Sequence, residues 1–180
     1  LEQLDPLTEA SGEAAQLAAD SGLSVALVVR GHLGPTVVRL DEPRYPLHVN
    51  LRVGTVMSVF NTITGRVFAA YLPERMVRSV LEDEHRRVVG GGSGAYDSAE
   101  VRQMLADIRA AGMGRGLSTP QPGVNTLSAP VFDADGKIAL VFTVIGPHGL
   151  FDAEINGPAG QLLRKHADAV SRRLGFNPAL

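Results

Sequence analysis

The first half of the chain alternates hydrophobic and polar positions in a way that predicts a sheet. Residues 23–30 form a run rich in β-branched side chains, and residues 36–40 form a second one. Residues 47–53 alternate strictly, which would turn His48 and Arg52 to the same face of a strand. We therefore predict that strands dominate this half of the chain.

The amino-terminal segment has the spacing of a helix. Apolar residues recur at helical intervals over residues 1–10, and Ser11-Gly12 supplies a stop, so we predict a short opening helix that ends there. Residues 13–20 are rich in alanine, as helices often are. The segment is short, however, and it leads through residues 20–22 directly into the first strand, so we interpret the region as a hairpin.

The second half of the chain changes to longer helical patterns and ends with two strands and a helix. Ser98 is a good N-cap and Gly112 a good stop for one of these helices, and residues 133–136 carry a strong hairpin signal. The glycine run at 90–94 predicts a flexible loop. The predicted helices cover residues 61–72, 74–81, 99–111 and 153–174, and the predicted strands cover residues 126–132 and 137–145.

This order of elements predicts one α+β domain, in which helices pack on an antiparallel sheet. The length of 180 residues fits a single core. The formal net charge of −2 gives no broad positive field for nucleic acid, so any contact with DNA is expected to come from another domain. Neither a membrane-spanning segment nor a leader peptide is evident, so we predict a soluble, cytoplasmic protein without a membrane partner.

The sequence offers little support for catalysis or for a cofactor. The absence of cysteine excludes thiolate chemistry and cysteine-bound metals. The glycines at 112–116 lack the final glycine of a dinucleotide motif and follow a helix, so we interpret them as a helix stop and turn. The five histidines are scattered, which predicts surface or packing residues and no metal site. We predict no enzyme activity and no cofactor.

Two segments are candidates for ligand binding. Residues 61–66 start a helix directly after a strand-like segment at 56–59, and a helix start favours a small anion. The alternative is that Asn61 or Thr62 merely caps the helix. The second candidate is the segment 116–126, a polar loop before a core strand, because loops held by a rigid sheet often carry ligand contacts.

Taken together, several motifs resemble the effector domain of the IclR family of bacterial transcription regulators. The resemblance runs from about residue 4 to residue 174, and it rests on the order and spacing of the motifs. They are Pro46 to Gly54, Thr62 with Gly65-Arg66-Val67 and Tyr71-Leu72-Pro73, Pro122-Gly123-Val124, Ser128 to Asp133, and Ile145-Gly146-Pro147.

The resemblance implies a GAF-like or profilin-like fold, with a curved antiparallel sheet, helices on both faces and a pocket for a small metabolite, often a carboxylate. It also implies a winged helix-turn-helix domain upstream of residue 1, and homodimers or homotetramers on DNA. Carried over by position, the effector-binding residues would be Phe60, Asn61, Thr62, Ile63, Thr64, Gly116, Ser118, Thr126, Thr143 and Ile145.

The chain departs from the family pattern at several of these positions. Phe60 stands where many members have histidine, Gly116 removes a carboxylate, and Ile145 replaces a hydroxyl. Losing polar anchors disfavours a very small polar ligand, so we predict an organic acid with an apolar or aromatic body, whose carboxylate meets Thr62 and Thr64. The alternatives are a vestigial pocket in a domain that serves oligomerisation, a GAF-like enzyme, and a module for cyclic nucleotides.

Overall fold

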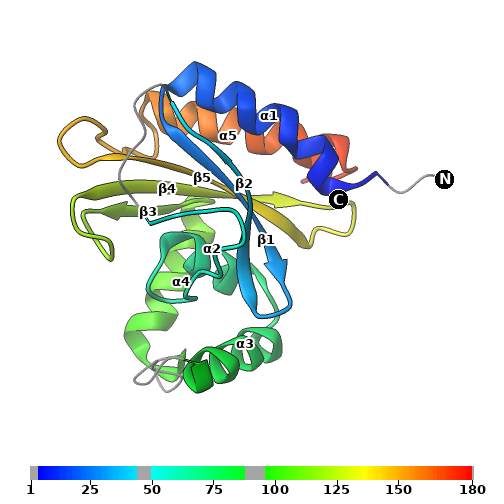
Figure 1. Cartoon of the computed structure of the whole chain (residues 1–180). Coiled ribbons are helices and arrows are strands. Elements are labelled where there is room, and N and C mark those ends of the chain that lie inside the picture. The colour runs from blue at the N-terminus through cyan, green and yellow to red at the C-terminus, as the bar shows by residue number, and fades with distance from the viewer. Residues whose placement is uncertain (1–3, 44–49, 88–95, 180) are drawn as a thin grey trace.

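The computed structural model describes residues 4–43, 50–87 and 96–179. These residues form a twisted five-stranded sheet in which every pairing is antiparallel, with helices on both faces (Figure 1). The predicted α+β architecture is therefore confirmed. The strands lie in the order β2-β1-β5-β4-β3 and span Ser24–Gly31 (β1), Gly34–Asp41 (β2), Gly114–Leu117 (β3), Val124–Phe132 (β4) and Ile138–Pro147 (β5).

Two helices cover one face of the sheet, and the others lie on the opposite side. Figure 1 shows α1 and α5 side by side on the first face, with α2 and α4 on the second and α3 beyond them. None of the helices in the described ranges is long and apolar enough to cross a bilayer. The helices span Pro6–Ser21 (α1), Ile63–Tyr71 (α2), Glu74–Arg87 (α3), Ala99–Ala111 (α4) and Pro158–Arg173 (α5).

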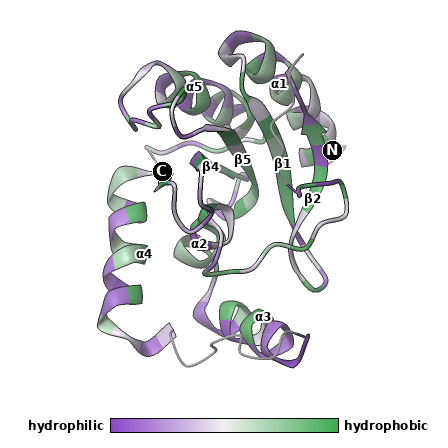
Figure 2. Cartoon of the chain, turned by 60° about the vertical axis from the view of Figure 1, so that its left-hand side comes forward, coloured by the Kyte–Doolittle hydropathy of each residue, from purple (hydrophilic) through white to green (hydrophobic). Residues whose placement is uncertain are grey.

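The sheet is buried on both faces, which gives the domain two apolar clusters. In β4, Leu127 and Val131 join the cluster beneath α1 and α5, whereas Val141 of β5 belongs to the cluster beneath α2 and α4. Figure 2 accordingly shows hydrophobic colouring along β1 and β5 and mixed colouring along the outer helix α4. Because successive side chains of a strand point to opposite faces of the sheet, some residues of β4 and β5 face the start of α2, where the candidate site lies.

The opening helix differs from its prediction. Residues 6–21 form one helix that continues through Gly12, and Gly22 in the left-handed conformation ends it. Ala10, Ala14 and Leu17 are fully buried on its inner face. Burial of this face outweighs the cost of about 1 kcal/mol for a glycine inside a helix, so neither the stop at residues 11–12 nor a hairpin at residues 13–20 forms.

The prediction of a strand at residues 47–53 is also wrong for residues 50–53, which the structure describes. Residues 50–53 adopt no strand, and Val56 makes a single bridge to Thr36. Residues 47–49 lie outside the described residues, as does the loop predicted at 90–94. Conversely, residues 114–117, which we interpreted as a turn, form the edge strand β3.

Helix ends vary in their agreement with the sequence. The bounds of α4, its N-cap Ser98 and its C-cap Gly112 are confirmed. The helix α3 runs to Arg87, beyond the predicted end at residue 81. The helix α5 begins at Pro158 instead of residue 153, because Ala153 adopts a positive φ of 52° in the preceding loop.

Candidate functional site

A cavity of about 270 Å³ lies between the start of α2, the strands β4 and β5, and two loops. Its lining contains no charged side chain among the described residues, and it mixes hydroxyl, amide and apolar groups. The lining residues are Asn50, Leu51, Thr55, Val56, Met57, Ser58, Asn61, Thr62, Ile63, Thr64, Thr119, Pro120, Gln121, Val124, Thr126, Thr143 and Ile145.

The start of α2 presents main-chain N–H groups at the cavity. Thr62 is the N-cap: its hydroxyl accepts a hydrogen bond from the Gly65 amide at 2.9 Å, and its carbonyl accepts one from the Arg66 amide. The amides of Ile63 and Thr64 have no hydrogen-bond acceptor among the described residues. They are the groups that an anion at a helix start would contact.

Three buried hydroxyls join α2 to the floor of the cavity. The Thr143 hydroxyl lies 2.7 Å from that of Thr64 and 2.8 Å from that of Ser128. All three residues are almost completely inaccessible to solvent. Because each hydroxyl both donates and accepts, the cluster satisfies itself and ties the first turn of α2 to β4 and β5.

Removing the central hydroxyl should weaken this tie. We expect Thr143→Val to lower the free energy of unfolding by about 1–3 kcal/mol, because Thr64 and Ser128 lose their shorter hydrogen bonds while the side-chain volume hardly changes. Urea denaturation measures the change. Thr119→Val, at an exposed threonine of the same cavity, is the control and should stay within about 0.5 kcal/mol of the native chain. Equal stability of the two variants would contradict the role of the cluster.

The outer wall of the cavity is an irregular segment held at the edge of the sheet. The Met57 amide donates to the Pro35 carbonyl at 2.7 Å, which fixes the segment beside β2. Glu84 of α3 accepts from the Ser58 hydroxyl with one carboxylate oxygen and from the Val59 amide at 3.0 Å with the other. The wall thus depends on contacts with residues distant in the sequence.

Asn125 anchors the loop that forms the other wall. Its Oδ1 accepts from the Ser118 amide at 3.0 Å and lies 2.8 Å from Nδ1 of His148, which must carry the proton because an amide oxygen only accepts. Its Nδ2 donates to the Phe151 carbonyl. Gly123 closes the loop by donating to the Ser118 hydroxyl at 2.8 Å. The buried amide therefore positions residues 119–121 over the cavity.

Other hollows of the surface have a different character. A groove of about 550 Å³ beside α4 is lined in part by the charged residues Arg66, Glu100, Asp107 and Arg115. Within the described ranges, no group of three or more histidine, aspartate or glutamate residues could hold a metal ion. The smaller cavity at α2 is the one that combines free amides with apolar walls.

The structure brings together most of the residues expected at the site. Asn61, Thr62, Ile63, Thr64, Thr126, Thr143 and Ile145 all line the cavity. The hydroxyl of Thr126 has no hydrogen-bond partner within the described residues, so it is free to contact a ligand.

Three expected residues lie elsewhere. The Phe60 ring packs toward Tyr96, with ring centres 6.1 Å apart, in the apolar cluster beneath α2 and α4. Gly116 belongs to β3, and a side chain there would overlap Ile63. Ser118 closes the 118–123 loop with its hydroxyl and does not line the cavity.

The residues that sequence reasoning missed belong mainly to the outer wall. Leu51, Val56, Met57 and Ser58 come from the region expected to be strand, and no regular spacing marks them as pocket residues. Their position follows from the bridge between Val56 and Thr36 and from Glu84. These are long-range contacts without a local signal.

The comparisons with known proteins give the class of the domain. A family model described as "Bacterial transcriptional regulator IclR C-terminal" matches residues 1–172. The chain belongs to the IclR family of bacterial transcriptional regulators and is a C-terminal regulatory domain of that family. Its relatives are regulators and not enzymes, which confirms the prediction that the chain is not an enzyme. Among curated proteins, none is similar enough to count as a match.

Solved structures agree with this assignment. The chain is 37% identical to Pseudomonas aeruginosa HmgR, with a TM-score of 0.87, and the match covers 98% of this chain and 70% of HmgR. It shares its fold with Thermotoga maritima IclR at 18% identity and a TM-score of 0.80, covering 97% and 70% of the two chains. It also shares its fold with the transcriptional regulator YaiJ at 20% identity and a TM-score of 0.78, covering 96% of each chain.

Proposed function

We propose that the cavity at the start of α2 binds a small organic acid, and that the domain senses this effector. The observation that carries the proposal is the pair of free amides, Ile63 and Thr64, at one end of an otherwise uncharged cavity. A carboxylate placed there would accept both N–H groups and lie at the positive end of the helix dipole. The free hydroxyl of Thr126 would supply a further polar contact.

The remaining lining favours an apolar body for this acid. Leu51, Val56, Met57 and Ile145 present hydrocarbon surface, and Pro120 covers the cavity from the second loop. The volume of about 270 Å³ lies just below the range of roughly 300–1,000 Å³ that is usual for drug-sized ligands. We therefore propose a compact acid about the size of one ring, and an aromatic acid satisfies both requirements.

The open cavity argues against a vestigial pocket. A pocket that had lost its ligand would be expected to fill with its own side chains, namely Phe60, Ile63 and Ile145. Ile63 and Ile145 line the cavity but leave a volume of about 270 Å³ open. Phe60 instead packs toward Tyr96, outside the cavity lining. This placement favours the sensor over a domain that serves oligomerisation alone.

We further propose that the domain acts within a cytoplasmic, homodimeric or homotetrameric regulator whose DNA contacts are made by a separate winged helix-turn-helix domain. The net charge of −2 supports a division in which this domain does not itself hold DNA. The match to HmgR, which covers 70% of that regulator, leaves room for such a domain in a protein of the same organisation. Effector binding would act by favouring one arrangement of the domains over another.

A thermal-shift screen tests the proposal. Benzoate and phenylacetate derivatives, short keto acids and sugar acids are each added to the native chain, and a ligand at 100 times its Kd should raise Tm by about 5–10 °C. We expect the aromatic acids to give the shift. Thr126→Val should weaken binding about tenfold, because it removes the free hydroxyl.

The matched control is Thr8→Val, which removes a threonine hydroxyl from α1, far from the cavity. Its own Tm changes, but the shift produced by the acid should equal that of the native chain. Absence of a shift from every acid in the panel would contradict the proposal. A full native shift in Thr126→Val, equal to that of Thr8→Val, would show that the ligand binds elsewhere.

A further inference from the structure

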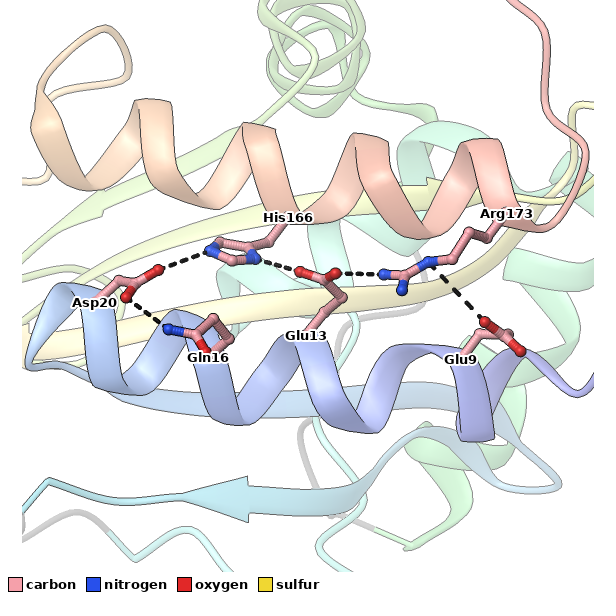
Figure 3. Close-up of polar contacts among 6 residues, drawn as sticks. All are labelled: Glu9, Glu13, Gln16, Asp20, His166 and Arg173. Atoms are coloured by element: carbon pink, nitrogen blue, oxygen red, sulfur yellow. Dashed lines mark hydrogen bonds and ion pairs between the residues drawn. The ribbon is translucent and has the colours of Figure 1, made fainter.

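The helices α1 and α5 are joined by a continuous chain of polar side chains. The helices run antiparallel on the outer face of the sheet, and Figure 3 shows six side chains meeting in the seam between them. We call this set the α1–α5 seam. It consists of Glu9, Glu13, Gln16 and Asp20 from α1 and His166 and Arg173 from α5.

His166 lies at the middle of the seam and is buried. Only 5% of its side chain is exposed, and each ring nitrogen faces a carboxylate of α1. Its Nδ1 contacts Glu13 Oε2, and its Nε2 lies 3.3 Å from Asp20 Oδ2. One ring therefore bridges two acidic side chains that are separated by two turns of α1.

The remaining groups of the seam occupy the other carboxylate oxygens. Arg173 contacts Glu13 Oε1, and its Nε lies 3.9 Å from Glu9 Oε2. Gln16 donates to Asp20 Oδ1 at 2.7 Å. With His166 neutral, the seam holds three carboxylates and a single guanidinium among these side chains, so it carries an excess of negative charge.

The other surfaces packed around His166 supply no further charge to the ring among the described residues. The strands beneath α5 contribute apolar side chains such as Leu127, Val131 and Leu140. At the Asp20 end, His148 and Asp152 line the same groove as Asp20 but make no hydrogen bond or ion pair with the ring. Glu13 and Asp20 therefore set the electrostatic surroundings of His166.

The protonation state of the ring determines how many of these contacts are hydrogen bonds. An imidazolium donates from both nitrogens, so it satisfies Glu13 and Asp20 together. A neutral ring donates from one nitrogen and turns the lone pair of the other toward a carboxylate oxygen. Charge-assisted bonds of this kind are about twice as strong as neutral ones, so losing one weakens the seam substantially.

We propose that the attachment of α1 to α5 depends on the protonation state of His166. The imidazolium form holds α1 against α5, and loss of its proton weakens this contact. This inference does not depend on the effector cavity, which lies on the opposite face of the sheet. It adds a second input to the domain, because α1 is the first helix of the fold and its attachment would depend on whether the ring carries the second proton.

The α1–α5 seam is also expected to lose stability at acidic pH. Burial opposes ionisation of Glu13, but hydrogen bonds from His166 and Arg173 outweigh it and lower the pKa of this carboxyl below its ordinary value of 4.5. A carboxyl whose pKa is lowered in the folded chain stabilises the fold above its ordinary pKa, and this contribution is lost as the pH falls. The seam should therefore weaken at acidic pH, as Glu13 takes up a proton.

The test is the melting temperature of the chain between about pH 5.5 and pH 8, measured beside an NMR titration of the imidazole nitrogens. We expect the native Tm to fall with rising pH by about 2–4 °C more than that of His166→Gln, with the fall following loss of the ring proton. The matched control His32→Gln removes an exposed histidine from the β1–β2 turn and should keep the native fall.

Asp20→Asn keeps the imidazole ring of His166 in place, and it replaces His166→Gln as the test variant if His166→Gln does not fold. A neutral ring can donate to Glu13 and accept from the new amide, so the extra fall in Tm should disappear in this variant. Retention of the full native fall in Asp20→Asn would overturn the proposal. A ring that does not change protonation over this interval would overturn it as well.

Discussion

Replacing Gly65 by alanine is expected to lower the free energy of unfolding by about 3 kcal/mol and to open the cavity wall. A β-carbon at this position would lie 2.3 Å from the Ser58 carbonyl oxygen and 2.4 Å from that of Val59. Both obstacles are main-chain atoms, which cannot rotate away. The first turn of α2 would have to separate from the segment that forms the outer wall, and the effector site depends on their contact.

Urea denaturation measures the loss, and Gly12→Ala provides the matched control. Gly12 also lies inside a helix, but a β-carbon there meets nothing within 4 Å. This substitution should raise stability by about 0.5–1 kcal/mol, because alanine favours the helix. The acid-induced shift in Tm should survive in Gly12→Ala and be lost in Gly65→Ala. Equal stability of the two variants would contradict the close approach at Gly65.

Placing aspartate at residue 116 should destabilise the domain by about 3–4 kcal/mol. The resemblance to the family implies that an acid is common at this position, so Gly116→Asp tests whether this chain can accept one. In the structure the space is taken: a β-carbon would lie 2.7 Å from Cγ1 of Ile63 and 2.5 Å from the Thr119 carbonyl oxygen. The new carboxylate would also be buried beside apolar groups.

The control for this change is Gly149→Asp, at a glycine with open space around it, which should alter stability by less than about 0.5 kcal/mol. Chemical denaturation of both variants gives the comparison. If Gly116→Asp proves as stable as Gly149→Asp, then β3 and Ile63 can move apart, and the close approach at Gly116 does not exclude a side chain there.

Local signals in the sequence were sufficient for much of the fold. Ser98 and Gly112 carry cap chemistry that does not depend on distant residues, and both ends of α4 follow from it. The turn at 133–136 likewise fixes the hairpin of β4 and β5, in which Asp133 accepts from the Asp135 and Lys137 amides. Elements whose ends are set by adjacent residues were thus predictable.

Elements that depend on tertiary contacts were not predictable from the sequence. Gly12 indicates a helix end, but burial of Ala10, Ala14 and Leu17 carries α1 through it. The edge strand β3 is short and rich in glycine, and it exists because residues 114–117 pair with β4. A strand of this composition has no periodicity of its own.

The residues of the candidate site fall into the same two groups, those placed by local signals and those placed by distant contacts. Thr62, Thr126 and Thr143 belong to regular elements, so their common location follows once the helix start and the strands are placed. The outer wall at 55–58 and the position of Phe60 depend on α3 and on Tyr96, which lie far along the chain. The polar floor was therefore predictable, whereas the apolar wall was not.

The most direct test of the effector site is an amide NMR titration of the chain with the acid that gives the largest thermal shift. Binding in the cavity should give saturable shifts that are largest at Ile63 and Thr64, with smaller shifts at Thr126 and at residues 119–121. Shifts that instead concentrate in the groove beside α4, around Met104 and Arg115, would place the ligand in that groove and rule out the cavity at the start of α2 as the effector site.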